Sequence, residues 1–203
     1  MNGSSTIATI VILAIGLSAL TVGTNGWSTW TAEAARRQAV VERPRPLPAY
    51  QLLDSRGESL TLAQSERDLT VVDLIYTQCP TVCLAMGAQF RQLQSELATA
   101  GLLERVELLS VTFDPANDDQ STLSDYLRRF GAVEPHWRAA RFQDNDELAA
   151  SLTDLGVIVI PEQSMGFVHN AAYYLIENGR VIEIFDIEAR TDLFEAIRAR
   201  LAT

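Results

Sequence analysis

Two cysteines, Cys79 and Cys83, are the residues of this sequence whose type and spacing point most directly to chemistry. They follow a β-branched apolar run that ends at Tyr76 and precede a stretch with helical periodicity, which predicts a junction between a buried strand and a helix. Backbone N–H groups and the positive end of a helix dipole favour thiolate over thiol, so we expect one or both sulfurs to be acidified and reactive. Two such sulfurs can close a disulfide or share a soft metal such as Cu(I), zinc or the iron of a cluster.

A third ligand would help to decide which metal binds. A site with four cysteines is excluded because the chain has two, and His136 and His169 are its imidazole donors. His136 is predicted to be a surface loop residue. His169 opens a predicted strand, where a single histidine is more often an ordinary strand residue than a ligand. An electron-transfer copper centre is disfavoured, because Gly87 and Phe90 stand four and seven positions after Cys83, where such a centre needs His and Met.

Asp73 is the third reactive candidate, because it lies inside the apolar run 71–75 and precedes Cys79 by six positions. A carboxylate in a central strand costs several kcal/mol unless it is paired, protonated or functional. Thioredoxins keep a buried Asp at the same offset, where it handles the proton of the second cysteine. A raised pKa would suit that role in thiol–disulfide exchange. The alternative is an edge strand whose Asp73 faces solvent or an arginine.

The elements that must position these residues alternate between strand-like and helix-like patterns from Ala49 to the C-terminus. Two hairpins are predicted at the turns 54–57 and 178–179, and Thr191 is the predicted cap of the last helix. The predicted strands are 50–53, 59–62, 69–76, 105–113, 138–142, 168–176 and 180–185, and the predicted helices are 82–100, 121–130, 144–156 and 192–201. The fold class is therefore α/β, with a mixed sheet covered by helices on both faces.

The first 48 residues differ from the rest. Residues 7–22 are apolar and uncharged, which predicts one N-terminal transmembrane helix within an anchor spanning 1–30, with Trp27 and Trp30 at the interface. A cleaved signal peptide is the alternative, with Ala-Glu-Ala at 32–34 as its cleavage site. Residues 31–48 are predicted to be a linker containing Pro and Arg, extended toward its end, and residues 49–203 the working domain.

Charge excludes one class of partner. The 203 residues carry 26 acidic and 16 basic side chains, a net charge of −10, and every basic residue is Arg. Such a chain has no long-range field to attract nucleic acid, so we expect no nucleic-acid partner.

The sequence resembles the Sco (SenC/PrrC) family of copper-binding thioredoxin-like proteins. The family motif YTxCPxxC matches 76–83, a strand ending in S-V-D-P matches 110–115 with a small insertion, and His169 stands where the family places a copper-ligand histidine. The resemblance implies a thioredoxin-like fold in which Cys79, Cys83 and His169 bind one Cu(I) or Cu(II). It also implies a single-pass protein of the bacterial inner membrane with its domain in the periplasm, although the arginines that follow the apolar run favour the cytoplasm by the positive-inside rule.

The function expected from this resemblance is that of a membrane-anchored copper chaperone with thiol-redox capability. It would serve assembly of a haem–copper (cytochrome c) oxidase copper centre, with an oxidase subunit or another copper chaperone as partner. The alternative is a periplasmic thiol:disulfide oxidoreductase that reduces partner cysteines without carrying copper, in which Cys79, Cys83 and Asp73 are catalytic and His169 is dispensable. A docking module without site chemistry is the third hypothesis. Whether the chain is an enzyme stays open at this point.

Overall fold

The structure is a computed structural model that describes residues 3–23, 31–79, 82–162 and 166–202. The chain divides into two compact units, Met1–Arg43 and Pro44–Thr203. Each unit is described by itself.

The N-terminal unit contains two helices, α1 (Gly3–Gly23) and α2 (Ala32–Glu42). The part of the chain that the structure describes holds no helix long and apolar enough to cross a membrane. Trp27 and Trp30, the predicted interfacial residues, lie outside the described residues. Helix α2 was not predicted. Its N-cap is Thr31, whose Oγ1 accepts a hydrogen bond from the backbone N–H of Ala34 at 3.0 Å.

The second unit carries the remaining elements. Its strands are β1 (Arg45–Pro46), β2 (Gln51–Asp54), β3 (Ser59–Thr61), β4 (Leu69–Ile75), β5 (Val106–Thr112), β6 (Trp137–Phe142), β7 (Val159–Glu162), β8 (Gly166–His169), β9 (Ala172–Glu177) and β10 (Arg180–Asp186). Its helices are α3 (Val82–Thr99), the short 3-10 helix η1 (Leu103–Arg105), α4 (Gln120–Phe130), α5 (Asn145–Leu155) and α6 (Arg190–Leu201).

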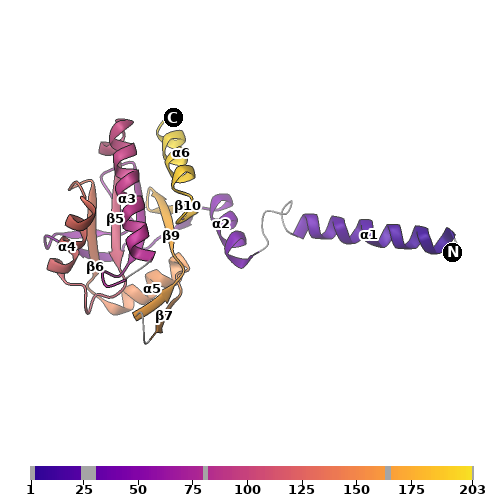
Figure 1. Ribbon diagram of the computed structural model, residues 1–203, viewed down its shortest axis with the longest axis horizontal. Coiled ribbons are helices and arrows are strands. Elements are labelled where there is room, and N and C mark those ends of the chain that lie inside the picture. Colours follow the sequence, from indigo (N-terminus) through magenta and orange to yellow (C-terminus); the bar gives the residue numbers. More distant parts are fainter. Residues whose placement is uncertain (1–2, 24–30, 80–81, 163–165, 203) are drawn as a thin grey trace. The chain divides into compact units, whose positions relative to one another are not determined.

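Eight strands form one mixed sheet in the order β1-β10-β9-β4-β5-β6-β2-β3 (Figure 1). Strands β4, β5 and β6 run parallel, and β9 joins β4 from the other side in antiparallel register. Every residue of β4 and β5 is buried, as expected of central strands covered on both faces. The predicted mixed sheet is confirmed, and β4 is at its centre.

Ring contacts identify the two faces of this sheet. On one face Trp137 of β6 packs edge-on against Phe90 of α3, with ring centroids 5.6 Å apart. Residues alternate in direction along a strand, so Phe142 of β6 points to the opposite face. There it packs against Tyr50, whose hydroxyl donates a hydrogen bond to Asp154 of α5 at 2.6 Å. Helices therefore cover both faces, as predicted.

Helices α3 and α4 lie side by side over the first of these faces, and a glycine sets their spacing. A Cβ atom added to Gly87 would lie 2.5 Å from the ring of Phe130, so a side chain at this position would force the two helices apart. Further along α3, the Gln94 side chain accepts a hydrogen bond from the backbone N–H of Val133 at 2.8 Å and donates one to the carbonyl of Gly131 at 3.2 Å. These bonds fix the chain that follows α4.

Two predicted elements differ from the structure. The single strand predicted over 168–176 is two strands, because the chain leaves β8 after His169 and enters the main sheet at Ala172 as β9. Strand β8 pairs with β7, which was not predicted, in a separate two-stranded sheet. The last helix begins at Arg190 after Ala189, so Thr191 is not its cap. The hairpin at 178–179 is confirmed, with φ of 49° at Asn178 and 72° at Gly179.

Candidate metal and thiol site

Both cysteines lie where β4 passes into α3, as predicted, and both are free thiols. Cys79 follows β4 and is 6% exposed, whereas Cys83 is in the first turn of α3 and is 2% exposed. The backbone N–H of Cys83 donates to the Sγ atom of Cys79 at 3.3 Å. The helix start thus directs a donor at the first sulfur, which stabilises negative charge there.

His169 reaches this junction from β8, although 86 positions separate it from Cys83 in the sequence. Its Nε2 atom lies 3.8 Å from the Sγ atom of Cys83. The rings of Tyr76 and Phe113 contact the imidazole, with the centroid of Phe113 4.9 Å from that of His169, and Phe167 packs against both of these rings. The imidazole is therefore held by packing in an apolar environment beside a thiol.

Burial sets the protonation of this pair. Burial raises the pKa of the Cys83 thiol well above its usual range, and the neighbouring Cys79 and Asp73 act in the same direction. Cys83 is thus not an acidified thiol, because desolvation outweighs the helix terminus, and the expectation rests on Cys79. Burial lowers the pKa of His169, so the imidazole is neutral at neutral pH and keeps a lone pair for a ligand. Tyr76, buried near Cys79, has its pKa raised to about 12.

Asp73 is fully buried in β4, which excludes the edge-strand alternative. Among the described residues, neither of its carboxylate oxygens has a hydrogen-bond partner within normal distance. Burial raises its pKa to about 7, although the neighbouring Ser110 hydroxyl lowers it in part. The buried hydroxyl oxygens of Tyr126 and Tyr173 also lack partners in the described chain, and the nearby Asp73 carboxylate contributes to raising the pKa of each.

Asp118 is a site residue that the sequence analysis missed. Its carboxylate is completely buried and accepts hydrogen bonds from the backbone and hydroxyl of Thr77 at 3.1 and 2.5 Å and from the hydroxyl of Thr112 at 2.5 Å. Thr77 stands two positions before Cys79, and Thr112 ends β5. Asp118 therefore ties the cysteine segment to the neighbouring strand. The signal available was an acidic residue just after the match at 110–115.

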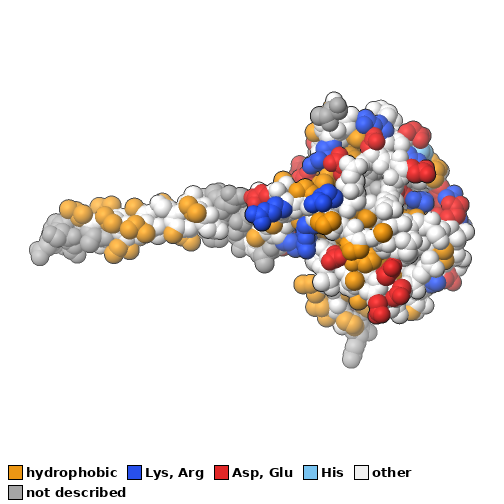
Figure 2. All heavy atoms as spheres, turned by 180° about the vertical axis from the view of Figure 1, so that it is seen from behind, with side chains coloured by type: hydrophobic (Ala, Val, Ile, Leu, Met, Phe, Trp, Pro, Cys, Tyr) orange, Lys and Arg blue, Asp and Glu red, His pale blue; other side chains and the backbone are white. Residues whose placement is uncertain are grey.

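The small β7–β8 sheet holds His169 outside the main sheet. Val159 pairs with His169, and the next residue, Asn170, ties this sheet to the end of α5. The Asn170 side chain accepts from the backbone of Ile158 at 2.7 Å and donates to the carbonyl of Gly156 at 3.0 Å. Apolar side chains protrude at this end of the domain (Figure 2), and Ile158, Ile160 and Val168 are 64%, 56% and 48% exposed.

The three predicted metal ligands lie close to one another in the structure. The structure brings Cys79, Cys83 and His169 to one junction, with contacts between successive members. It assembles no group of three or more His, Cys, Asp or Glu side chains close enough to hold a metal ion among the residues that it describes. His136 lies elsewhere, with its Nε2 atom 3.5 Å from Glu104. It lies in a turn, as predicted, and its side chain is 13% exposed.

A sequence model of the SCO1/SenC family matches residues 39–202. The chain belongs to the SCO1/SenC family. The resemblance found in the cysteine motif is thereby confirmed over the whole second unit and not for the motif alone.

Solved structures show that this SCO1/SenC chain has the fold of its family. A SCO1/SenC family lipoprotein from Bacillus anthracis superposes with a TM-score of 0.71 at 22% identity, covering 80% of this chain and 99% of the other. BsSco, described as a Sco family cytochrome c oxidase assembly protein with a disulfide switch, gives 0.68 at 19% identity, covering 77% and 94%. Yeast Sco1 with copper bound gives 0.64 at 18% identity, covering 79% and 90%. The predicted thioredoxin-like α/β fold is confirmed.

Proposed function

We propose that this protein is a copper chaperone with thiol-redox capability that binds one copper ion through Cys79, Cys83 and His169. It delivers the ion during assembly of a haem–copper oxidase copper centre. Yeast Sco1, which has the same fold, is known with copper bound, and BsSco is described as an oxidase assembly protein. Copper is the cargo here, and its acceptor is an oxidase subunit or another copper chaperone.

The 3.8 Å separation between Cys83 Sγ and His169 Nε2 is the observation that carries this proposal. With bonds of about 2.3 Å to sulfur and about 2.1 Å to nitrogen, as for zinc, two ligands of one trigonal ion stand about 3.8 Å apart. Two thiolates and a neutral imidazole match Cu(I), which prefers soft ligands. The lowered pKa of His169 keeps its nitrogen available. A movement of Cys79 toward this pair completes the set.

Asp73 is the proposed proton acceptor for the thiols. The buried Cys83 thiol, with its raised pKa, keeps its proton at neutral pH until a metal or a disulfide replaces it. Formation of a Cys79–Cys83 disulfide breaks the disulfide of a partner. Two electrons pass to the partner's two sulfurs, and the two protons that the cysteines lose end on these sulfurs. A buried carboxylate with a pKa of about 7 can take up one of these protons at neutral pH.

Copper binding tests the proposal. The reduced protein is titrated with Cu(I) in competition with a chromogenic chelator. We expect one tight equivalent, with affinity lowered at least about tenfold, or about 1.4 kcal/mol, in H169A. H136A is the matched control and should bind like the wild type. A dissociation constant weaker than about 1 μM, or equal affinities of H169A and the wild type, would contradict the copper role.

A thiol:disulfide oxidoreductase without copper is the second candidate, and the burial of Asp73 favours it as much as it favours the chaperone. In that case His169 is dispensable for reduction of a partner disulfide, whereas D73N slows exchange. Copper affinity of the wild type and of H169A separates the two functions, because D73N slows exchange in both.

Attachment to the bacterial inner membrane, with the second unit in the periplasm, is part of the same proposal. The uncharged helix α1 supports it, because its apolar side chains are exposed, with Ile12 70% and Leu13 67% accessible. The related protein of Bacillus anthracis is a lipoprotein. An alkaline phosphatase fusion after residue 45 should be active in cells, and an inactive fusion would reverse the orientation.

A further inference from the structure

Three arginines of the second unit have no partner in the part of the chain that the structure describes. The side chains of Arg45, Arg91 and Arg129 make neither an ion pair nor a hydrogen bond there, whereas the side chains of the other arginines of this unit do. All three are exposed. In a chain with a net charge of −10, which holds 26 acidic residues, unpaired cations are unusual enough to ask what they bind.

Two of these arginines border hollows between α3 and α4. One hollow of about 430 Å³ lies between Cys79 and Leu84 on one side and Tyr126 and Arg129 on the other. The second, of about 460 Å³, is bordered by Ala88 and Arg91 of α3 and by Gly131 after α4. The two hollows follow one another along α3, on either side of the close contact at Gly87. Cys79 is buried on its other sides and borders the first hollow.

We propose that this α3–α4 groove receives an acidic, cysteine-bearing segment of the partner protein, with the partner sulfur at Cys79 and its carboxylates on Arg91 and Arg129. The proposal deepens the proposed function and rests on the thiol chemistry of Cys79. Charge complementarity identifies the occupant, because guanidinium groups bind carboxylates in a bidentate manner. Asp125, which also borders the first hollow, is neutralised by its ion pair with Arg128.

Distances along the helix fix where the acidic residues must stand. Leu84 and Arg91 are seven residues apart on α3, which corresponds to about 10 Å at about 1.5 Å per residue. An extended partner chain covers that length with about three residues. A carboxylate two or three positions from the partner cysteine therefore reaches Arg91 while the partner sulfur reaches Cys79, and Arg129 borders the same hollow as Cys79.

The probe is the peptide Glu-Glu-Ala-Cys-Ala-Glu-Glu, with its cysteine joined by a disulfide to nitrothiobenzoate, and the reference peptide has Gln in place of each Glu. The Cys79 thiol loses its proton to the buffer and attacks the peptide sulfur. A new disulfide forms, and coloured nitrothiobenzoate leaves as a thiolate. Because both peptides carry the same leaving group, the ratio of their rates reports the charge of the segment alone.

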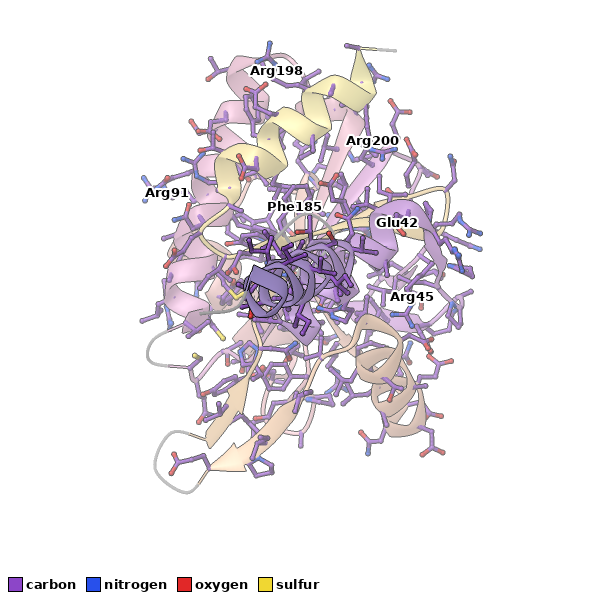
Figure 3. All side chains as sticks on the ribbon, turned by 90° about the vertical axis from the view of Figure 1, so that its right-hand side faces the viewer. Glu42, Arg45, Arg91, Phe185, Arg198 and Arg200 are labelled. Atoms are coloured by element: carbon purple, nitrogen blue, oxygen red, sulfur yellow. The ribbon has the colours of Figure 1, made fainter. Side chains whose placement is uncertain are left out.

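In the full-length wild type we expect the acidic peptide to react faster than the reference. R91Q and R129Q should each lower this ratio about three- to fivefold, as expected for losing one exposed ion pair. R45Q is the matched control, because Arg45 is also unpaired but projects from the opposite side of the domain from Arg91 (Figure 3). It makes the same change in net charge outside the groove. A ratio near one in the wild type, or an equal loss in R45Q, would overturn the proposal.

Docking is also measured without thiol chemistry, so that the two proposals can fail separately. A labelled peptide with Ser in place of Cys is titrated with the protein, and binding is followed by fluorescence anisotropy. Salt-sensitive binding that R91Q and R129Q weaken supports the groove, even if Cys79 proves inert toward both disulfides and the proposed function falls. If Cys79 reacts but the acidic and neutral peptides bind equally and weakly, the groove proposal is overturned and the proposed function still stands.

Discussion

Replacing Asp73 with Asn should stabilise this protein at neutral pH, and the gain should disappear in acid. The pKa of Asp73 is raised from 3.8 to about 7 by burial. In the unfolded chain the carboxyl loses its proton near pH 4, whereas in the folded protein it keeps the proton until about pH 7. The folded state therefore binds more protons between these values, and the free energy of unfolding falls as the pH rises.

The magnitude follows from the size of the shift. One pKa unit corresponds to about 1.4 kcal/mol, so a shift of about three units lowers the stability of the wild type by about 4 kcal/mol between pH 4 and pH 7. Asn does not ionise, so D73N lacks this loss. We expect D73N and the wild type to be nearly equal in stability near pH 4, and D73N to be more stable by about 4 kcal/mol above pH 7.

Urea unfolding of residues 44–203 at pH values from 4.5 to 7.5 measures this difference. These residues form a compact unit, and its single tryptophan, Trp137, is fully buried and gives a fluorescence signal. D125N is the matched control, because Asp125 is exposed, and the change should leave the pH profile unaltered. A constant difference between D73N and the wild type, or one that grows toward acid, would refute the raised pKa of Asp73.

Three further substitutions test the parts that position the site. D118N should destabilise the domain by about 1–3 kcal/mol in urea unfolding, because a buried carboxylate with three hydrogen bonds is replaced. It should also speed alkylation of Cys79. Unchanged alkylation would mean that the cysteine segment does not depend on Asp118. G87A should cost about 1–3 kcal/mol, because its Cβ would lie 2.5 Å from the ring of Phe130, and F130L should recover part of that cost in the double variant. N170A should weaken Cu(I) binding while leaving the free energy of unfolding in urea within about 1 kcal/mol of the wild type, because the two hydrogen bonds of Asn170 fix the small sheet and not the core. A large loss of global stability would contradict this.

The sequence alone was sufficient for features that depend on local pattern. The apolar run around Asp73 predicted a buried central strand, and the position of Cys79 and Cys83 predicted the strand-to-helix junction. A buried Asp73 was one of two alternatives at that point, and its central place in the sheet decides between them. These predictions needed no knowledge of which other elements lie nearby.

Other features depended on contacts that no local pattern records. Asp118 positions the cysteine segment through its hydrogen bonds with Thr77 and Thr112, which come close to it only when the chain folds. The raised pKa of Cys83 reflects how deeply α3 is packed, which outweighs the helix terminus that the sequence indicated. The break after His169 was missed because apolar residues continue across it, and strand β7 was missed because it has four residues and includes Pro161.

The placement of His169 on a two-stranded sheet has a consequence for release of cargo. A hairpin of two strands is marginally stable by itself, and local opening of such a unit costs far less than unfolding of the whole domain. The two sulfurs, by contrast, are at the end of a central strand and the start of a long helix. In the proposed copper site, the imidazole nitrogen can therefore withdraw before either sulfur does, which would lower the number of ligands from three to two. Release of the ion to an acceptor would then begin with dissociation of the imidazole, at a rate set by the opening of β7 and β8.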